Sequence, residues 1–189
     1  MQPMSILDFE ARYRAEPDPW GYTTRAYERD KYAATLAACG PGPFRCALEL
    51  GASIGVFSAL LAPRCGALTT VDAAPTAVAA ARRRLADAPQ VDATLGTIPD
   101  AIPRRPYDLV VASEILYYLT PNQLSLTLSK VAELLERHGR VVAVHWWPAG
   151  PDRPLSAAEV HETLRRQPWL RSMVSAGTDD YLLDVLVRV

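Results

Sequence analysis

Residues 46–55, Cys-Ala-Leu-Glu-Leu-Gly-Ala-Ser-Ile-Gly, constrain the fold more than any other part of the chain. The segment begins as a short apolar run, typical of a buried strand, and ends in a turn that contains Gly51 and Gly55. Glycine adopts backbone conformations that other residues avoid and lets a ligand approach the main chain closely. A helical pattern follows over residues 56–62, so the segment predicts a strand, a tight turn and a helix.

A carboxylate follows this unit at an informative distance. A second apolar run, residues 67–72, ends at Asp72, which lies 21 residues after Gly51. A spacing of about 20 residues is expected for an acid that binds a ribose hydroxyl at the end of the second strand. The order of strand, glycine turn, helix, strand and acid therefore predicts the nucleoside-binding half of a doubly wound sheet.

Apolar runs and helical patterns alternate along the rest of the chain. Further strands are predicted over residues 91–95, 107–113 and 141–145, and helices over residues 75–85, from 121 to the glycine at 139, and from 156 to about 168. The tail, residues 169–189, reads as an antiparallel hairpin. This alternation predicts an α/β fold whose mostly parallel sheet has helices on both faces. We expect one domain, with a helical cap at residues 1–45 on a Rossmann-like core at residues 46–189.

Composition narrows the classes of partner. The formal net charge is −1 and no basic run is present, so the chain lacks the electrostatic footprint of a nucleic-acid-binding protein. The three cysteines show no metal-ligand spacing, so no metal site is expected. The sequence shows no signal peptide and no apolar run of membrane length, which predicts a cytoplasmic protein without a membrane partner.

Strand ends group the candidate site residues. In open α/β sheets, ligands bind beyond the carboxyl ends of the strands, at the point where the strand order reverses. This rule brings together five segments that are far apart in the sequence: residues 51–55, Asp72, residues 96–98, 113–118 and 145–147.

The turn itself argues against a dinucleotide. A pyrophosphate-binding turn usually reads G-x-G-x-x-G, whereas Ser53 replaces the middle glycine here. Glu49, two residues before the turn, would repel a phosphate and suits a cationic ligand. A dinucleotide oxidoreductase is therefore disfavoured.

These motifs carry a resemblance to a known family. Residues 49–55, Asp72 and residues 108–119 resemble the motifs of Rossmann-type S-adenosylmethionine-dependent methyltransferases. With Asp-Pro-Trp at residues 18–20 as a further point of similarity, the chain is most similar to the NodS-like branch of N-methyltransferases, over roughly residues 8 to 145. The resemblance implies a seven-stranded sheet with an antiparallel last strand, and S-adenosyl-L-methionine as cofactor.

The resemblance also implies which residues surround the cofactor. They are Trp20, Arg29, Lys31, Glu49, Gly51, Ala52, Ser53, Gly55, Asp72, Ala73, Thr97, Ile98, Ser113 and Tyr118. Asp72 would bind both ribose hydroxyls, and Arg29 or Lys31 would meet the methionine carboxylate. Thr97 stands where the family often carries an aspartate that reads the adenine amine.

Methyl transfer from a sulfonium needs a nucleophile held in line with the methyl group, and an amine must arrive without its extra proton. A base near the acceptor can take that proton, and the strand-end candidates are Glu114 and His145, with Tyr117 as an orienting hydroxyl. Alternatively, the amine binds as a cation beside Glu114 and loses its proton to water.

The leading hypothesis is an N-methyltransferase acting on a small amine acceptor, such as an amino sugar or oligosaccharide; the nitrogen and the sugar follow from the resemblance alone. The alternatives are an O-methyltransferase for a small secondary metabolite and a cofactor-binding protein without turnover. Residues 146–154, where the resemblance fades, are expected to shape the acceptor pocket.

Overall fold

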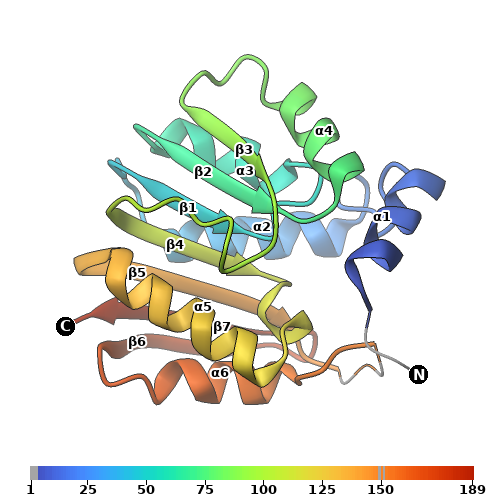
Figure 1. The fold of residues 1–189 in the computed structure, drawn as a ribbon. Helices are drawn as coiled ribbons and strands as arrows, with labels where there is room; N and C mark the ends of the chain where they lie inside the picture. Colours follow the sequence, from blue (N-terminus) through green and yellow to red (C-terminus); the bar gives the residue numbers. More distant parts are fainter. Residues whose placement is uncertain (1–3, 149, 151) are drawn as a thin grey trace.

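Seven strands form one sheet in the order β3-β2-β1-β4-β5-β7-β6 in the computed structural model, which describes residues 4–148, 150 and 152–189. Strand β7 alone runs antiparallel to its two neighbours (Figure 1). The strands are β1 (Ala47–Leu50), β2 (Leu68–Asp72), β3 (Val91–Leu95), β4 (Tyr107–Ser113), β5 (Leu135–Trp146), β6 (Leu170–Gly177) and β7 (Tyr181–Arg188). The predicted fold class, a mostly parallel seven-stranded sheet with an antiparallel last strand, is confirmed.

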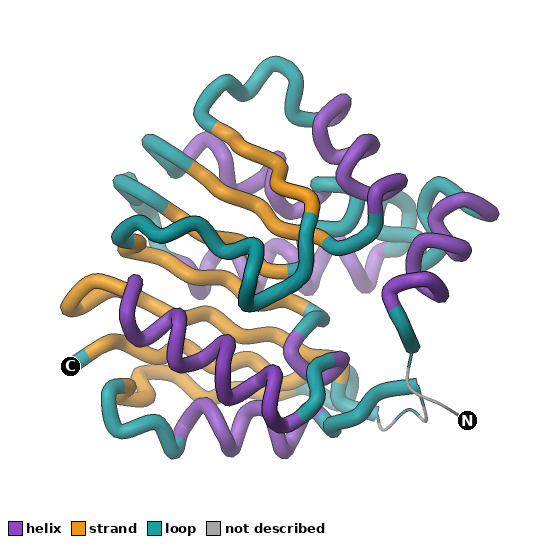
Figure 2. The backbone as a smooth tube through the Cα atoms, in the orientation of Figure 1, coloured by secondary structure: helices purple, strands orange, loops and turns teal. Residues whose placement is uncertain are grey.

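Helices cover both faces of this sheet (Figure 2). They are α1 (Ile6–Ala15), α2 (Ala26–Cys39), α3 (Val56–Leu61), α4 (Pro75–Arg84), α5 (Pro121–Leu134) and α6 (Ala157–Arg165), with the short 3₁₀ helices η1 (Ala62–Arg64) and η2 (Leu116–Tyr118). Helices α5 and α6 lie on one face, while α2 and α3 lie on the other (Figure 1). Within the described ranges, no helix has the length and apolar character needed to cross a bilayer.

Alternate residues of the central strands supply the two cores. Leu48 of β1 and Val110 of β4 pack with α5 and α6, whereas Ala47 and Val111 pack with α2 and α3. Because successive side chains of a strand point to opposite faces, a sheet covered on both sides needs apolar residues at nearly every position. This need explains the near-continuous apolar runs of β1 and β4.

The two helices expected as a cap separate in the structure. Helix α2 packs on the sheet, where Tyr32 and Cys39 join the same core as Val142 of β5. Helix α1 instead lies beyond the carboxyl ends of the strands, beside α4 (Figure 1). Helix α1 thus lies over the strand ends, whereas the apolar face of α2 belongs to the main core.

Helix α5 is shorter than the sequence predicts. It begins with the expected capping box of Thr120 and Gln123, but it ends at Leu134, not at Gly139. Leu135 is already extended and pairs with Tyr107, and the left-handed backbone of His138 (φ 65°) turns the chain into the long part of β5. Leu135 is buried, as a residue on the apolar stripe of a longer helix would also be. Hydrophobicity alone therefore does not show whether Leu135 belongs to the helix or to the strand.

Gly51 predicts a measurable effect on stability. Its φ is +76°, and a Cβ at this position would lie 2.7 Å from the Cβ of Ile115. We expect Gly51→Ala to lower the free energy of unfolding by about 1–3 kcal/mol, the cost of a strained backbone conformation, as measured by urea denaturation. Gly177→Ala is the matched control, since its nearest neighbour is the flexible end of Leu182. Equal stability of the two variants would contradict the strain at Gly51.

Candidate ligand-binding site

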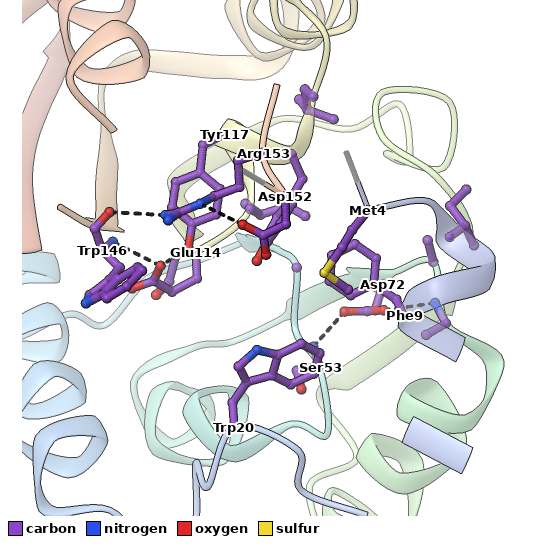
Figure 3. A pocket seen from close by; sticks show the side chains of 18 of the residues that line it. Met4, Phe9, Trp20, Ser53, Asp72, Glu114, Tyr117, Trp146, Asp152 and Arg153 are labelled. Carbon is purple, nitrogen blue, oxygen red and sulfur yellow. Dashed lines mark hydrogen bonds and ion pairs between the residues drawn. The ribbon is translucent and has the colours of Figure 1, made fainter. Parts of the chain in front are cut away.

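A cavity of about 1090 Å³ lies at the carboxyl ends of the parallel strands. Its walls come from the ends of β2, β4 and β5, from α1, α2 and η2, and from nearby loops, including the loop after β3. Asp72 and Glu114 lie on separate sides of the cavity, and Trp20 lines it below both of them in the view of Figure 3. Cavities of this size bind small molecules and cofactors.

Asp72 is held by main-chain donors. Its carboxylate accepts hydrogen bonds from the backbone N–H groups of Ser53, at 2.8 Å, and Ala74, at 2.9 Å. Burial raises the pKa of Asp72, and the backbone donors act against this by stabilising the charged form. A carboxylate has about four acceptor positions, so two remain for donors in the cavity.

The glycine turn brings the donor of Ser53 into place. Gly51 and Ser53 both have left-handed backbones, with φ of 76° and 51°. The hydroxyl of Tyr13, on α1, donates to Ser53 Oγ at 2.6 Å, and the ring of Tyr13 packs on Trp20 with centroids 5.2 Å apart. The turn and the covering helix therefore support one wall together.

Glu10 fixes α1 over the strand ends. Its carboxylate accepts hydrogen bonds from the backbone N–H and the hydroxyl of Thr76, at 2.9 and 2.7 Å. Thr76 lies in the first turn of α4, where backbone N–H groups lack helical partners and favour a negative charge. These bonds lower the pKa of Glu10.

A buried charge cluster forms the other side of the cavity. Lys31 Nζ lies 2.9 Å from Glu28 Oε2 and 2.8 Å from Glu114 Oε1, and the side chain of Lys31 is almost fully buried. Glu114 Oε2 accepts from the backbone N–H of Trp146 at 3.0 Å and from the hydroxyl of Tyr117. Burial raises the pKa of Glu28, and the ammonium of Lys31 lowers it in turn. With all three groups charged, the cluster itself has a formal charge of −1, and the nearby Arg25 also lowers the pKa of Glu28.

Aromatic rings complete the walls. Arg153 lies with its guanidinium 4.5 Å from the ring centre of Tyr117 and 5.0 Å from that of Trp146 (Figure 3). The ring of Phe9, on α1, meets Tyr118 edge-on, with centroids 4.9 Å apart. Arg153 thus ties the loop after β5 to η2.

The family model of nodulation protein S (NodS) matches residues 6–144. The chain belongs to the NodS family. Nodulation protein S of Sinorhizobium fredii (strain NBRC 101917 / NGR234) is 33% identical over 109 residues, which are 57% of this chain and 50% of the relative. The chain spans about half the length of the curated relatives it matches.

Two solved structures share the fold. The N-methyltransferase NodS from Bradyrhizobium japonicum WM9, in complex with S-adenosyl-L-homocysteine, has a TM-score of 0.87 at 23% identity, over 98% of this chain and 99% of that chain. A candidate methyltransferase from Pseudomonas syringae has a TM-score of 0.76 at 36% identity, over 87% of this chain and 100% of that chain.

Most residues predicted from this NodS-family sequence line the one cavity. They are Trp20, Lys31, Gly51, Ser53, Asp72, Ala73, Thr97, Ile98, Ser113, Glu114, Tyr117 and Tyr118. Their roles toward a ligand stay predictions. Ala52 and Gly55 belong to the turn but do not line the cavity. Ala52 is buried, and Gly55 packs against Ala81 of α4.

Arg29, predicted to meet the methionine carboxylate, does not line the cavity. Its side chain is exposed and lies 3.5 Å from Asp30, outside the cavity. Arg25, Glu28 and Lys31 line the cavity instead. Residues three apart share one face of a helix, and residue 29 lies about 100° around the helix from residue 28. The helical period thus contained the signal that Arg29 points elsewhere.

The predicted place of Glu49 at the ligand was also wrong. Its side chain points into the core, where Oε2 accepts from Ser58 Oγ at 2.6 Å, and only 3% of the residue is exposed. Burial raises the pKa of Glu49 to about 8, with Asp72 as a further raising charge. A carboxyl that points into the core does not face a ligand in the cavity, so only Ser53 argues against a dinucleotide.

His145 does not meet the cavity. It is fully buried, and its Nε2 accepts from the backbone N–H of Leu116 at 3.1 Å. Tyr117 packs edge-on against the ring, with centroids 5.0 Å apart. Because both ring nitrogens have partners outside the cavity, the structure does not place His145 as a base toward a ligand there.

Several cavity residues were missed, chiefly Phe9, Tyr13, Arg25, Tyr27, Glu28 and Arg153. Phe9 and Tyr13 are four residues apart on α1, a spacing that shows a common face but not what that face covers. Arg153 lies in a loop whose course depends on contacts with η2, so its sequence neighbours carried no signal. No group of at least three His, Cys, Asp or Glu residues that could hold a metal is found in the described parts of the chain.

Glu49 predicts a pH dependence of stability. A carboxyl whose pKa is raised on folding binds a proton more tightly in the folded state, so its stabilising contribution is present below pH 4.5 and is lost as the pH rises to about 8. We expect Glu49→Gln to gain stability relative to the unmutated chain as the pH rises across this window, by at most about 1.4 kcal/mol per pH unit. Urea denaturation at pH 5, 6.5 and 8 measures the difference.

The control is Glu133→Gln, on the exposed side of α5. A constant stability difference between Glu49→Gln and the unmutated chain at all three pH values would show that Glu49 is charged in the folded protein.

Proposed function

We propose that this chain is an S-adenosyl-L-methionine-dependent N-methyltransferase for a small amine. The arrangement of Asp72 carries the cofactor assignment: its carboxylate is fixed by Ser53 and Ala74, and two acceptor positions remain toward the cavity. Two vicinal ribose hydroxyls supply two such donors. The similar fold of a NodS structure with bound S-adenosyl-L-homocysteine supports the same ligand.

The cavity residues fit such a cofactor part by part. Asp72 would bind the ribose, and Thr97 and Ile98 would border the adenine. Gly51 and Ser53 line the cavity, so the methionine part would pass along the main chain of this turn. The cofactor would supply an activated methyl group; the protein would supply orientation, which is worth up to about 7–11 kcal/mol when reactants are well aligned.

The charge cluster favours an amine as acceptor. Glu28 and Glu114 share one ammonium, that of Lys31, so a second ammonium would balance the remaining charge. Three donors already bind Glu114, which leaves about one acceptor position on its carboxylate. The buried hydroxyl of Tyr27 lines the cavity and has no hydrogen-bond partner among the described residues. A ligand with a polar hydrogen would fill the open position on Glu114.

An amino sugar, free or within an oligosaccharide, is the acceptor that we favour. Trp146 lines the cavity and is 40% exposed, so its indole offers an apolar wall of the kind on which a sugar ring can lie. Asp180, in the turn before β7, lines the same cavity as Phe9 of α1. We therefore propose that the chain acts as one domain.

A paired-acceptor assay tests the function. The protein is incubated with S-adenosyl-L-methionine and either glucosamine, a short glucosamine oligomer or the matching glucose compounds, and products are read by mass spectrometry. Methylated amines without methylated alcohols are expected. Methylated alcohols alone would favour an O-methyltransferase, while S-adenosyl-L-homocysteine binding without any product would favour a binding protein.

Asp72 should dominate cofactor affinity. Asp72→Ala removes one or two charge-assisted hydrogen bonds to the ribose, each worth about 1.5–3 kcal/mol, so titration calorimetry with S-adenosyl-L-homocysteine should show weaker binding by that amount. Asp72→Asn keeps the shape of the side chain, so its affinity for S-adenosyl-L-homocysteine should lie between those of the unmutated protein and Asp72→Ala. Asp87→Ala, on the exposed surface, is the control. Unchanged affinity of Asp72→Ala would refute the ribose contact.

Glu114 should affect turnover more than cofactor binding. Glu114→Gln removes the charge that the acceptor ammonium would meet, so we expect turnover to fall at least about tenfold, the effect of losing one charged contact. Affinity for S-adenosyl-L-homocysteine should change little. Glu133→Gln is again the control. Turnover at the unmutated level would show that Glu114 only supports the fold.

A further inference from the structure

A row of buried groups lies behind the cavity and is not used in the chemistry above. The backbone N–H of Leu116 donates to His145 Nε2 at 3.1 Å, and His145 Nδ1 lies 3.1 Å from His161 Nε2. His161 Nδ1 lies 2.9 Å from Asp184 Oδ2, which also accepts from Arg165 at 2.7 Å. The two histidines are fully buried, and Asp184 is 1% exposed. The row runs from η2 through β5 and α6 to β7.

Only one placement of protons satisfies every bond in this row. The N–H of Leu116 can only donate, so His145 Nε2 must be the acceptor and a neutral His145 carries its proton on Nδ1. That proton is donated to His161 Nε2, which must then be bare. His161 therefore carries its own proton on Nδ1 and donates it to Asp184.

A charged histidine would break the row. If His161 were protonated on both nitrogens, its Nε2–H would point at His145 Nδ1, and His145 would need two bare nitrogens. If His145 were protonated on both, its Nε2–H would face the N–H of Leu116. Both histidines are thus neutral, and the charges stay on Asp184 and Arg165.

The far end of the row meets the site. Leu116 is the first residue of η2, and the next residue, Tyr117, donates to Glu114 and packs on the ring of His145. Trp146, beside His145 on β5, donates its backbone N–H to the same carboxylate. His145 and Trp146, which are adjacent on β5, thus bind Leu116 and Glu114 respectively.

We propose that His145 and His161 are positioning residues, which hold η2 so that Tyr117 and Glu114 stay in place at the acceptor side of the cavity. Asp184 selects the tautomer of His161, and His161 in turn selects that of His145. The effect on turnover rests on the proposed function, whereas the proton arrangement does not depend on it.

The surroundings keep this arrangement neutral. The groups with charge or titrating protons around His145 are Tyr117, His161, Lys31 and Arg153, and those at His161 are Asp184 and Arg165. Burial lowers the pKa of His145 well below its usual range, and the two cations add to this. These surroundings favour the neutral form of His145 that its two hydrogen bonds require.

Two variants of His145 separate position from volume. The side-chain oxygen of His145→Gln reaches the place of Nε2 and can still accept from Leu116, whereas His145→Asn reaches only the place of Nδ1. We expect exchange of the Leu116 amide to be roughly two- to tenfold faster in His145→Asn, the factor that one net hydrogen bond represents, and near the unmutated rate in His145→Gln. Turnover should fall in His145→Asn and recover in His145→Gln, with equal affinity for S-adenosyl-L-homocysteine.

Nitrogen NMR of the unmutated protein decides the matter even if a variant fails to fold. Both histidines should show the Nδ1–H tautomer and stay neutral from pH 8 to pH 6. An Nε2–H signal on either ring, or equal Leu116 exchange in the two variants, would overturn the inference. If the unmutated protein methylates no acceptor, the proposed function fails. The histidine NMR and the Leu116 amide exchange still test the proton arrangement in that case.

Discussion

Two backbone N–H groups that converge on Asp72 connect the first two strands at the edge where a ligand would lie. The donor from Ser53 exists only because the turn passes through left-handed conformations at Gly51 and Ser53. That turn in turn needs the close approach of Ile115, which leaves no space for a side chain at Gly51. The geometry of the carboxylate therefore depends on the packing of three strand ends at once.

The wall of the cavity opposite Asp72 is held together by buried charges. There, Lys31 lies between two carboxylates in a nearly dry environment, and Glu114 holds a left-handed backbone (φ 56°) that directs its side chain at the cluster. Burying charges costs free energy unless their hydrogen bonds are satisfied. A cluster that keeps one surplus negative charge beside a cavity is consistent with a cationic partner that completes it.

The sequence predicted what local patterns determine. Apolar runs, glycine turns and capping boxes located all seven strands, and the rule of strand ends grouped Asp72, Ser113 and Glu114 correctly. The sequence-based prediction failed where one residue fits two patterns. Leu135 fits both the apolar stripe of α5 and the core side of β5, and only its pairing with Tyr107 assigns it to the strand. It also failed where the direction of a side chain depends on what packs against its strand, as for Glu49 and His145. Arg29 is a different case, because the helical period of α2 already separates it from Glu28. The direction of Glu49 is set by which face of β1 meets Ser58, and no periodicity within four residues reveals that.

The hairpin of β6 and β7 lies outside the family match at residues 6–144, and yet Asp184 of β7 is the last member of the row that reaches η2. The side of the cavity that holds Asp72 depends on the ends of β1 and β2 and on the loop after β3. The side that holds Glu114 is supported by β5 and β7, which come later in the chain. Under the proposed function, exchange of the C-terminal segment between relatives would alter the acceptor side of the cavity without disturbing the strand ends around Asp72.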